Sequence, residues 1–363
     1  MTSDRVAVLG TGLIGTSIAM AAARAGHEVS GWDADPAVAA RAAARAGLSV
    51  ATSLQASVEG ASIVVVCAPI AEIPRVVVET LRTAPEAIVT DVGSIKKQVM
   101  RSVRSAAGPG DLPRFVGGHP MGGSERSGPE HASPSIVDGI VWALTPGPTT
   151  DAGAVGAMES FVRGLGALPM RMDAERHDRL VAFVSHLPQI ASTTLMGLAA
   201  TEEASEPEIL LLAAGGFRDL TRLAASNPAL WSEILVANSD AIGEAIDLYV
   251  ERLLALRGLV AGARSAELEE AFEAAKSARL QLVAKPRVRS GVAVFQVEVP
   301  DRPGALAQLT GAMAEGKVNI EDLQIVHSPE GGRGTVHLMV AAPDAEETVT
   351  VLEGRGFDPI RLA

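Results

Sequence analysis

A glycine-rich turn close to the amino terminus constrains the fold of this chain more than any other feature. Residues 6–9 form an apolar run typical of a buried parallel strand, and Gly10, Gly12 and Gly15 follow it with GxGxxG spacing. Such glycines supply the tight turn, the close backbone approach and the close helix packing that a pyrophosphate group requires. The turn therefore predicts a dinucleotide-binding βαβ unit.

The helix after this turn and the strand that follows it complete the unit. A helix predicted over residues 13–25 directs its free backbone N–H groups, beginning with those of Leu13 and Ile14, toward the phosphates. Residues 27–32 form the next predicted strand. Asp33 ends this strand where a carboxylate can accept hydrogen bonds from both hydroxyls of an adenosine ribose. This arrangement favours NAD over NADP.

The composition is typical of a globular protein with two or three domains. The chain has 363 residues, of which 47% are hydrophobic and only 3% aromatic, so small aliphatic side chains must build the cores. The net charge of -12, without a block rich in Lys or Arg, argues against nucleic acid or an anionic membrane as a partner.

The sequence also bears on the cellular compartment. Cys67 is the single cysteine, which excludes an intramolecular disulfide framework. The first residues lead into a strand without a basic and apolar leader, and no apolar run reaches the length of a membrane span. We therefore expect a cytoplasmic protein, and we expect no metal site.

The strand predicted at residues 62–67 ends in Ala68 and Pro69. In open parallel sheets, ligands lie at the carboxyl ends of the strands. These two residues therefore either line the cofactor or simply end the strand.

Polar residues gather at the ends of two later predicted strands. The strand at residues 87–91 leads to Ser94 and Lys96, and the next strand leads to His119. A histidine between a glycine and a proline is expected on irregular backbone, where catalytic groups are common, and its imidazole can take up a proton near neutral pH. We expect His119 to be the catalytic base. Ser94 either orients its ring or caps a helix, and Lys96 either holds a substrate carboxylate or caps the same helix.

A change of pattern at Asp173 indicates a second domain. The sheet is expected to end with a strand at residues 140–145 and a helix at 153–165. Helices are then predicted over residues 174–200, 209–213, 217–225, 228–261 and 265–283, and the fourth of these segments can contain a break. Helices that carry apolar residues on more than one face usually bury the extra face against a second copy. The pattern therefore predicts an all-helical dimerisation domain.

Two polar clusters interrupt these apolar helices, SHLPQ at residues 185–189 and GGFRDLTR at residues 215–222. Asp219 and Arg222 are three residues apart and share a helix face. The pair either presents Arg222 for bidentate capture of a substrate carboxylate or forms an exposed ion pair within the helix.

The last part of the chain has a different pattern, in which predicted strands alternate with helices. Its predicted order is strand, helix, two strands, helix and strand, at residues 292–299, 305–314, 318–327, 334–341, 345–352 and 358–361. This order is the βαββαβ, ferredoxin-like unit. We place the three domains at residues 1–172, 173–284 and 290–363.

Several of these motifs, in this order and spacing, resemble one known family. GTGLIGTS, DVGSIK, GGHPMGGSE, SHLPQ and GGFRDLTRLA, followed by Trp231, are similar to bacterial prephenate dehydrogenases over about residues 5–280. The tail PDRPGALAQLTGAMAEGKVNIEDLQI is similar to an ACT domain, a small regulatory module that binds amino acids. The resemblance implies a Rossmann-type parallel sheet domain, an all-helical dimerisation domain and a C-terminal ferredoxin-like ACT domain.

The resemblance also implies a reaction, the NAD-dependent oxidative decarboxylation of prephenate to 4-hydroxyphenylpyruvate in L-tyrosine biosynthesis. In this reaction His119 would accept the hydroxyl proton with support from Ser94, and Arg222, set by Asp219, would hold the ring carboxylate. The other residues that the resemblance places at the substrate are Lys96, Ser124, Glu125, His186 and Gln189, the last of which replaces a histidine common in the family.

Two other functions are also compatible with parts of this sequence. Arogenate dehydrogenase uses the same mechanism on a substrate with an amino group in place of the side-chain keto group. Gln189 offers no carboxylate to an ammonium group, which favours prephenate. The second alternative is an inactive amino-acid-sensing protein, and the presence of His119, Ser94 and Arg222 together argues against it.

The ACT-like tail implies regulation by an amino acid, with L-tyrosine as the expected effector. In such a module the loop from Asp301 to Gly304 brings backbone N–H groups to the ligand carboxylate, and Asn319 binds the amino acid across an interface between modules. The alternative is that the tail only stabilises the dimer, since this loop is also an ordinary turn.

Overall fold

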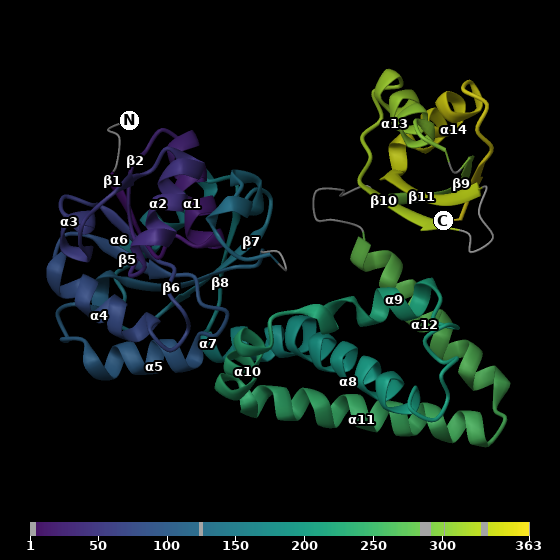
Figure 1. Cartoon of the computed structure of the whole chain (residues 1–363), viewed down its shortest axis with the longest axis horizontal. Helices are drawn as coiled ribbons and strands as arrows, with labels where there is room; N and C mark the ends of the chain where they lie inside the picture. The colour runs from purple at the N-terminus through teal and green to yellow at the C-terminus, as the bar shows by residue number, and fades with distance from the viewer. Residues whose placement is uncertain (1–4, 123–125, 284–291, 301, 328–332, 363) are drawn as a thin grey trace. The chain divides into compact units, whose positions relative to one another are not determined.

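The computed structural model describes residues 5–122, 126–283, 292–300, 302–327 and 333–362 (Figure 1). Contacts divide the chain into two compact units. The first contains Met1–Thr193 and Leu223–Leu248, and the second contains Thr194–Arg222 and Tyr249–Ala363. The three predicted domain boundaries do not coincide with this division and stay predictions.

The first unit is built on an eight-stranded sheet with the order β3-β2-β1-β4-β5-β6-β7-β8. Its strands are β1 Arg5–Leu9, β2 Glu28–Trp32, β3 Ser49–Val50, β4 Ile63–Val66, β5 Ile88–Asp91, β6 Phe115–Pro120, β7 Val141–Pro146 and β8 Leu168–Arg171. The strands from β3 to β6 are parallel, as a Rossmann-type fold requires. The predicted fold class is therefore confirmed for this unit.

The far side of the sheet differs from the prediction. β7 runs antiparallel to β6, because the described residues between them form only 3₁₀ turns and no crossover helix that would return the chain in the same direction. The expectation that the sheet ends at residues 140–145 is also wrong. β8 pairs with β7 at the sheet edge, and its largely exposed sequence LPMR lacks the apolar run that marks a buried strand.

Helices cover both faces of this sheet. They are α1 Leu13–Arg24, α2 Pro36–Ala46, α3 Leu54–Val58, α4 Ile73–Thr83, α5 Lys97–Ala106 and α6 Ala152–Gly164. One buried cluster joins α1 and α6 to the sheet through residues such as Ile18 and Phe161. A second joins α3, α4 and α5 to the other face through Val77 and Val103. This layering leaves the carboxyl ends of the parallel strands together at one edge.

A wide turn interrupts the first long helix after the sheet. α7 spans Ala174–Val181, a π-helical turn spans Ala182–His186, and α8 spans Leu187–Glu202. Pro188 explains the turn, because proline has no N–H to donate and its ring collides with the carbonyl four residues earlier in a regular α-helix. The wider turn removes both conflicts without ending the helix.

The remaining helices are α9 Gly215–Thr221, α10 Pro228–Ala237, α11 Ser239–Ala261 and α12 Ser265–Val283. The predicted break within residues 228–261 lies at Asn238. The helix predicted at residues 209–213 is wrong, since the segment forms only separate turn hydrogen bonds.

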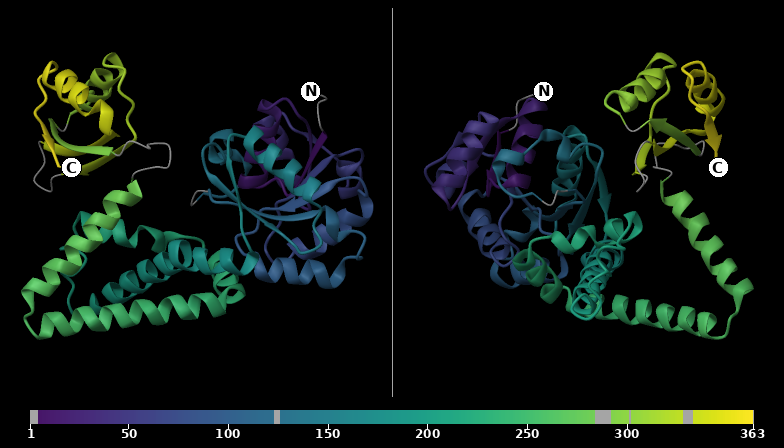
Figure 2. Two further views of the ribbon diagram at one scale, coloured as in Figure 1. Left: turned by 180° about the vertical axis from the view of Figure 1, so that it is seen from behind. Right: turned by 45° about the vertical axis from the view of Figure 1, so that its right-hand side comes forward.

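The C-terminal module is a four-stranded antiparallel sheet with the order β10-β11-β9-β12 and two helices. Its elements are β9 Val292–Pro300, α13 Ala305–Glu315, β10 Asp322–His327, β11 Arg333–Ala341, α14 Ala345–Glu353 and β12 Pro359–Arg361. Figure 2 shows both helices on one side of this sheet, and Phe295, Leu309 and Leu352 lie in the core between them. The predicted βαββαβ order is confirmed.

None of the described helices combines the length and the apolar character that a bilayer-spanning helix needs.

Candidate active site

The glycine turn after β1 has the shape of a phosphate-binding loop. Gly10 has a φ of 97°, and a Cβ there would collide with the Cys67 carbonyl oxygen. A Cβ on Gly15 would collide with the Gly10 carbonyl oxygen, whereas a Cβ on Gly12 would meet nothing within 4 Å. Two of the glycines thus allow α1 to pack on the sheet, and the third leaves the start of α1 open to a ligand phosphate.

Asp33 lies against this turn. One oxygen of its carboxylate accepts a hydrogen bond of 2.7 Å from the Thr11 N–H, and the other accepts one of 2.9 Å from the Asp35 N–H. Leu13 and Ile14 open α1, and Ala68 and Pro69 follow β4 on the same edge of the sheet. The predicted cofactor residues therefore belong to neighbouring strand ends.

His119 lies within strand β6, opposite Ala143 of β7, so the expectation of irregular backbone is wrong. The two glycines before it allow the strand to continue here. A Cβ on Gly118 would approach the Asp91 carbonyl oxygen to 2.5 Å and the Trp142 Nε1 to 2.9 Å. The close packing of β5, β6 and β7 therefore needs glycine at this position and carries His119 to the end of the strand.

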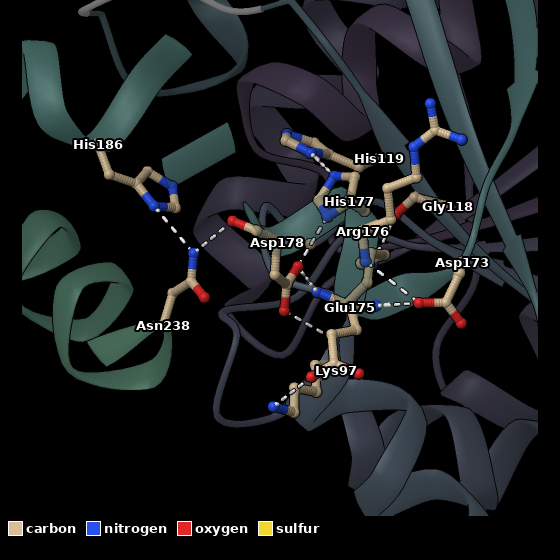
Figure 3. Close-up of polar contacts among 12 residues, drawn as sticks. Lys97, Gly118, His119, Asp173, Glu175, Arg176, His177, Asp178, His186 and Asn238 are labelled. Atoms are coloured by element: carbon tan, nitrogen blue, oxygen red, sulfur yellow. Dashed lines mark hydrogen bonds and ion pairs between the residues drawn. The ribbon is translucent and has the colours of Figure 1, made fainter. Parts of the chain in front are cut away.

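A hydrogen-bonded series leads from His119 into α7. His119 Nδ1 lies 2.8 Å from His177 Nε2, and His177 Nδ1 lies 2.7 Å from Asp178 Oδ1 (Figure 3). Asp173 fixes the start of α7, because its carboxylate caps the N–H groups of Glu175 and Arg176. This first turn sets the position of His177 beside the sheet.

Asp178 is held from the other side by α5. Its Oδ1 accepts a hydrogen bond from the Lys96 N–H and its Oδ2 accepts one from the Lys97 N–H, each of 2.8 Å. These groups belong to the first turn of α5, where the helix dipole favours a negative charge. Asp178 thus joins α5 to α7 directly behind His177.

Lys96 is fully buried and its ammonium group faces the protein interior. Nζ forms an ion pair with Asp91 and donates a 2.7 Å hydrogen bond to the Gly118 carbonyl oxygen. Asp91 in turn accepts hydrogen bonds from the N–H groups of Gly93 and Gly118. Burial lowers the pKa of Lys96, and the Asp91 carboxylate opposes this shift. This placement favours a role in holding Gly118, and it does not favour the predicted contact with a substrate carboxylate.

The surroundings of His119 keep its imidazole neutral. Burial is the main reason that its pKa lies well below the usual value, and unfavourable electrostatic interactions with His177, Lys96 and His186 lower the pKa further. A neutral imidazole at physiological pH can accept a proton, which is the first requirement of a general base.

The π-helical turn brings His186 into the same network. In a regular α-helix, at about 100° per residue, His177 and His186 would lie on opposite sides, and the wider turn reduces this rotation. Asn238 Nδ2 donates to the Asp178 carbonyl oxygen at 2.9 Å and to His186 Nδ1 at 3.2 Å (Figure 3). Burial lowers the pKa of His186 to about 4. His186 is therefore neutral, with its proton on Nε2.

Gln189 is also buried, one turn after His186. Its Nε2 donates to the Leu223 carbonyl oxygen at 2.8 Å and to the Thr193 hydroxyl at 3.3 Å. Its Oε1 has no hydrogen-bond partner among the described residues. The amide orientation is fixed, because a rotated amide would place two acceptors, its own oxygen and that of Leu223, against each other.

The other predicted site residues lie as follows. Ser94 is half-buried in the loop between β5 and α5, and the described partner of His119 Nδ1 is His177 rather than Ser94. Asp219 is in α9 and Arg222 directly follows this helix, both in the second compact unit. Ser124, Glu125 and Asp301 lie outside the described residues.

The sequence interpretation missed four residues of this network, namely Asp91, His177, Asp178 and Asn238. The adjacent His177 and Asp178 carried a signal, because a polar pair on an otherwise buried helix face needs partners in the interior. Asp91 and Asn238 gave no such signal. In the local sequence, Asp91 looks like the end of an ordinary strand and Asn238 like an ordinary break between helices.

A dinucleotide-binding sheet with a neutral, hydrogen-bonded histidine at its strand ends defines a nucleotide-dependent oxidoreductase. Comparisons with known proteins agree. Residues 18–170 match the family described as prephenate dehydrogenase, nucleotide-binding domain, residues 173–274 match prephenate dehydrogenase, dimerization domain, and residues 293–353 match the ACT domain. The chain belongs to the prephenate dehydrogenase family.

Individual relatives show the extent of the match. The chain is 32% identical to a prephenate dehydrogenase of Bacillus subtilis over 94% of its own length and 93% of that protein. A crystal structure of prephenate dehydrogenase from A. aeolicus, in complex with hydroxyphenyl propionate and NAD+, is 26% identical, with a TM-score of 0.72 over 78% of this chain and 99% of that one. A Synechocystis arogenate dehydrogenase is 28% identical, with a TM-score of 0.68 over 77% and 99% of the two chains.

Proposed function

We propose that this protein oxidises prephenate to 4-hydroxyphenylpyruvate and carbon dioxide with NAD as the hydride acceptor. The observation that carries the proposal is the buried His119, hydrogen-bonded through Nδ1 to His177, at the same edge of the sheet as the phosphate-binding turn. The related A. aeolicus enzyme binds NAD+ and a phenolic acid that resembles the product. The protein is proposed to act in the cytoplasm, as a homodimer formed through its helical domain.

The residues of this chain account for the proton chemistry. NAD, when bound along Gly10, Gly12 and Asp33, supplies the acceptor for the hydride that leaves the ring carbon bearing the hydroxyl. His119 takes the hydroxyl proton, so a carbonyl develops on the ring. The opposite carbon–carboxylate bond then breaks, its electrons make the ring aromatic, and carbon dioxide leaves. His119 returns its proton to the phenolate oxygen, so the reaction releases no net proton.

Steady-state kinetics test the proposal directly. NADH formation by the purified protein is followed by absorbance with prephenate and, separately, with arogenate as the variable substrate. We expect a larger kcat/KM with prephenate. No NADH formation with either substrate would overturn the proposed reaction.

Arogenate is a second candidate substrate, and one observation favours it. The buried Gln189 Oε1 is an acceptor without a described partner, and it suits the ammonium group of arogenate better than the keto oxygen of prephenate. A higher kcat/KM with arogenate in the same assay would assign this substrate, and replacing Gln189 by histidine should then reduce the preference.

The first prediction concerns Arg222. The resemblance assigns it to the ring carboxylate, and a charge-assisted bidentate pair is lost when Arg222 becomes glutamine. We expect KM for prephenate to rise by roughly tenfold or more, with a smaller change in kcat. Arg218→Gln, four residues earlier in α9, is the matched control. Equal KM values for wild type and Arg222→Gln would show that another cation holds the carboxylate.

The second prediction concerns the choice between NAD and NADP. Asp33→Ala removes the carboxylate that would repel a 2′-phosphate, so the ratio of kcat/KM for NAD over NADP should fall. Glu28→Ala removes the same charge at the exposed start of β2 and serves as the control. A ratio that is unchanged in Asp33→Ala would mean that Asp33 does not face the ribose.

The third prediction concerns regulation by L-tyrosine, which we propose as the ligand of the ACT domain. Gly304 has a φ of 90°, where a β-branched residue is strained, and it directly precedes α13 as its N-cap. Gly304→Val should weaken tyrosine binding in calorimetry, whereas Gly304→Asn, which tolerates this backbone, should retain more of it. Asn319 Nδ2 donates a hydrogen bond of 2.6 Å to Glu321 Oε1 within the same module. Full-length protein that binds no tyrosine, with activity unaltered by it, would refute this regulation.

A further inference from the structure

The hydrogen bonds behind His119 determine where each proton lies. Asp178 accepts hydrogen bonds with both carboxylate oxygens, and Oδ1 receives His177 Nδ1 at 2.7 Å as well as the Lys96 N–H. A carboxylate is only an acceptor, so the proton of this bond belongs to His177 Nδ1. If His177 were protonated only on Nε2, the lone pair of its Nδ1 would face the Asp178 carboxylate and the two would repel each other.

This placement fixes the next proton in the series. In the neutral form of His177, which the proposal below takes as its premise, Nδ1 holds the single ring proton and Nε2 is left with a lone pair. That lone pair faces His119 Nδ1 at 2.8 Å and can only accept from it. His119 therefore carries its own proton on Nδ1, and its lone pair lies on Nε2, which has no hydrogen-bond partner among the described residues.

From this geometry we propose that His177 and Asp178 are positioning residues that hold His119 in the tautomer with Nδ1 protonated and Nε2 as the proton acceptor. The inference rests on the proposed function and extends it to two residues that do not touch the substrate. A base held in the other tautomer would present an N–H to the substrate hydroxyl and could not take its proton.

Burial makes the series rigid. His177 and Asp178 are 1% and 3% exposed, so water does not compete for their hydrogen bonds. The first turn of α5 anchors Asp178, and the Gly118 peptide before His119 is held by Lys96 and Asp91. Both ends of the series are thus fixed to neighbouring strands and helices.

The charges around His119 also suit this role. Burial of its ring and the positive charge of the nearby Lys96 disfavour a lasting positive charge on His119. The Asp178 carboxylate lies beyond His177 and compensates part of the charge that His119 gains when it takes the hydroxyl proton. Because the proton returns to the substrate oxygen, His119 and its hydrogen-bonded partners need to hold it only briefly and do not need to release it to solvent.

The tautomer can be measured on the whole protein without substrate. Nitrogen-15 NMR of protein labelled in histidine distinguishes protonated from unprotonated ring nitrogens, and the His119→Asn spectrum identifies the His119 signals. We expect protonated Nδ1 and unprotonated Nε2. The opposite tautomer would overturn the proposal, even if the enzyme oxidises prephenate. Conversely, the expected tautomer in a protein inactive on prephenate and arogenate would uphold the proposal and reject the reaction.

Two variants of His177 provide the functional test. His177→Leu removes the acceptor, so His119 should lose its single tautomer and kcat should fall at least about tenfold, with little change in KM for prephenate. His177→Gln can accept from His119 with Oε1 and donate to Asp178 with Nε2, so it should restore the tautomer and most of kcat. A wild-type kcat in His177→Leu would refute the positioning role of His177. If His177→Leu does not fold, the tautomer of His119 in the wild-type and His177→Gln spectra still tests the proposal.

Discussion

Replacing His119 with asparagine should lower kcat for prephenate by roughly 100-fold or more, while the dissociation constant for NAD stays unchanged. Asparagine can still hydrogen-bond the substrate hydroxyl, but it cannot take its proton. His119 lies on β6, whereas the cofactor residues come from the turn after β1 and from the ends of β2 and β4. The variant therefore separates proton transfer from cofactor binding.

The control for this variant is His131→Asn. His131 ends a short 3₁₀ turn and is exposed, so the same substitution there should leave kcat and NAD affinity unchanged. Stopped-flow mixing of enzyme and NAD with prephenate measures hydride transfer directly, and fluorescence titration measures NAD binding. Near-normal hydride transfer in His119→Asn would reject His119 as the base.

Replacing Lys96 with methionine should have the largest effect on stability. The substitution leaves Asp91 as a buried charge without its cation, and breaking a buried ion pair in this way costs about 3–5 kcal/mol. Asp91 keeps the hydrogen bonds from Gly93 and Gly118, which moderate the loss. The free energy of unfolding, measured by urea titration at equilibrium, should fall accordingly.

Two controls separate the buried charge from other effects. Lys97→Met removes the adjacent lysine, whose ion pair with Glu175 is exposed to solvent, and should cost far less. The double variant Lys96→Met with Asp91→Asn carries no unpaired charge and should regain part of the lost stability. Equal losses in Lys96→Met and Lys97→Met would show that the buried pair does not stabilise the fold as inferred.

The local pattern of the chain was sufficient to predict most of the secondary structure. The sequence predicts helices at residues 36–46 and 265–283, and the bounds of α2 and α12 agree with this prediction. For α2, Pro36 at the helix start and the Gly47 that follows are signals read within a few residues. The glycine turn and the βαββαβ order of the C-terminal module were likewise predicted from spacing alone. Such signals depend only on neighbours in sequence.

Other features depended on pairing between distant segments. The sequence predicted neither the antiparallel direction of β7 nor the edge strand β8, since strand direction follows from the connection and from the space at the sheet edge. The π-helical turn was also missed. A proline at position 188 indicates that the helix is distorted there. Whether the distortion is a kink or a wider turn depends on what the following helix packs against.

The active site divides in the same way. His119 could be proposed from the sequence, because two predicted strands carry polar residues to the same edge of the sheet and His119 lies at the end of one of them. Its partner His177 lies 58 residues away, and the ammonium group of Lys96 pairs with the buried Asp91, which the sequence interpretation did not predict. Spacing along the chain predicts which side chains lie on one strand or helix face. Only the packing of α5 and α7 against the sheet decides which buried donor meets which acceptor, because each group must find its partner where water is excluded.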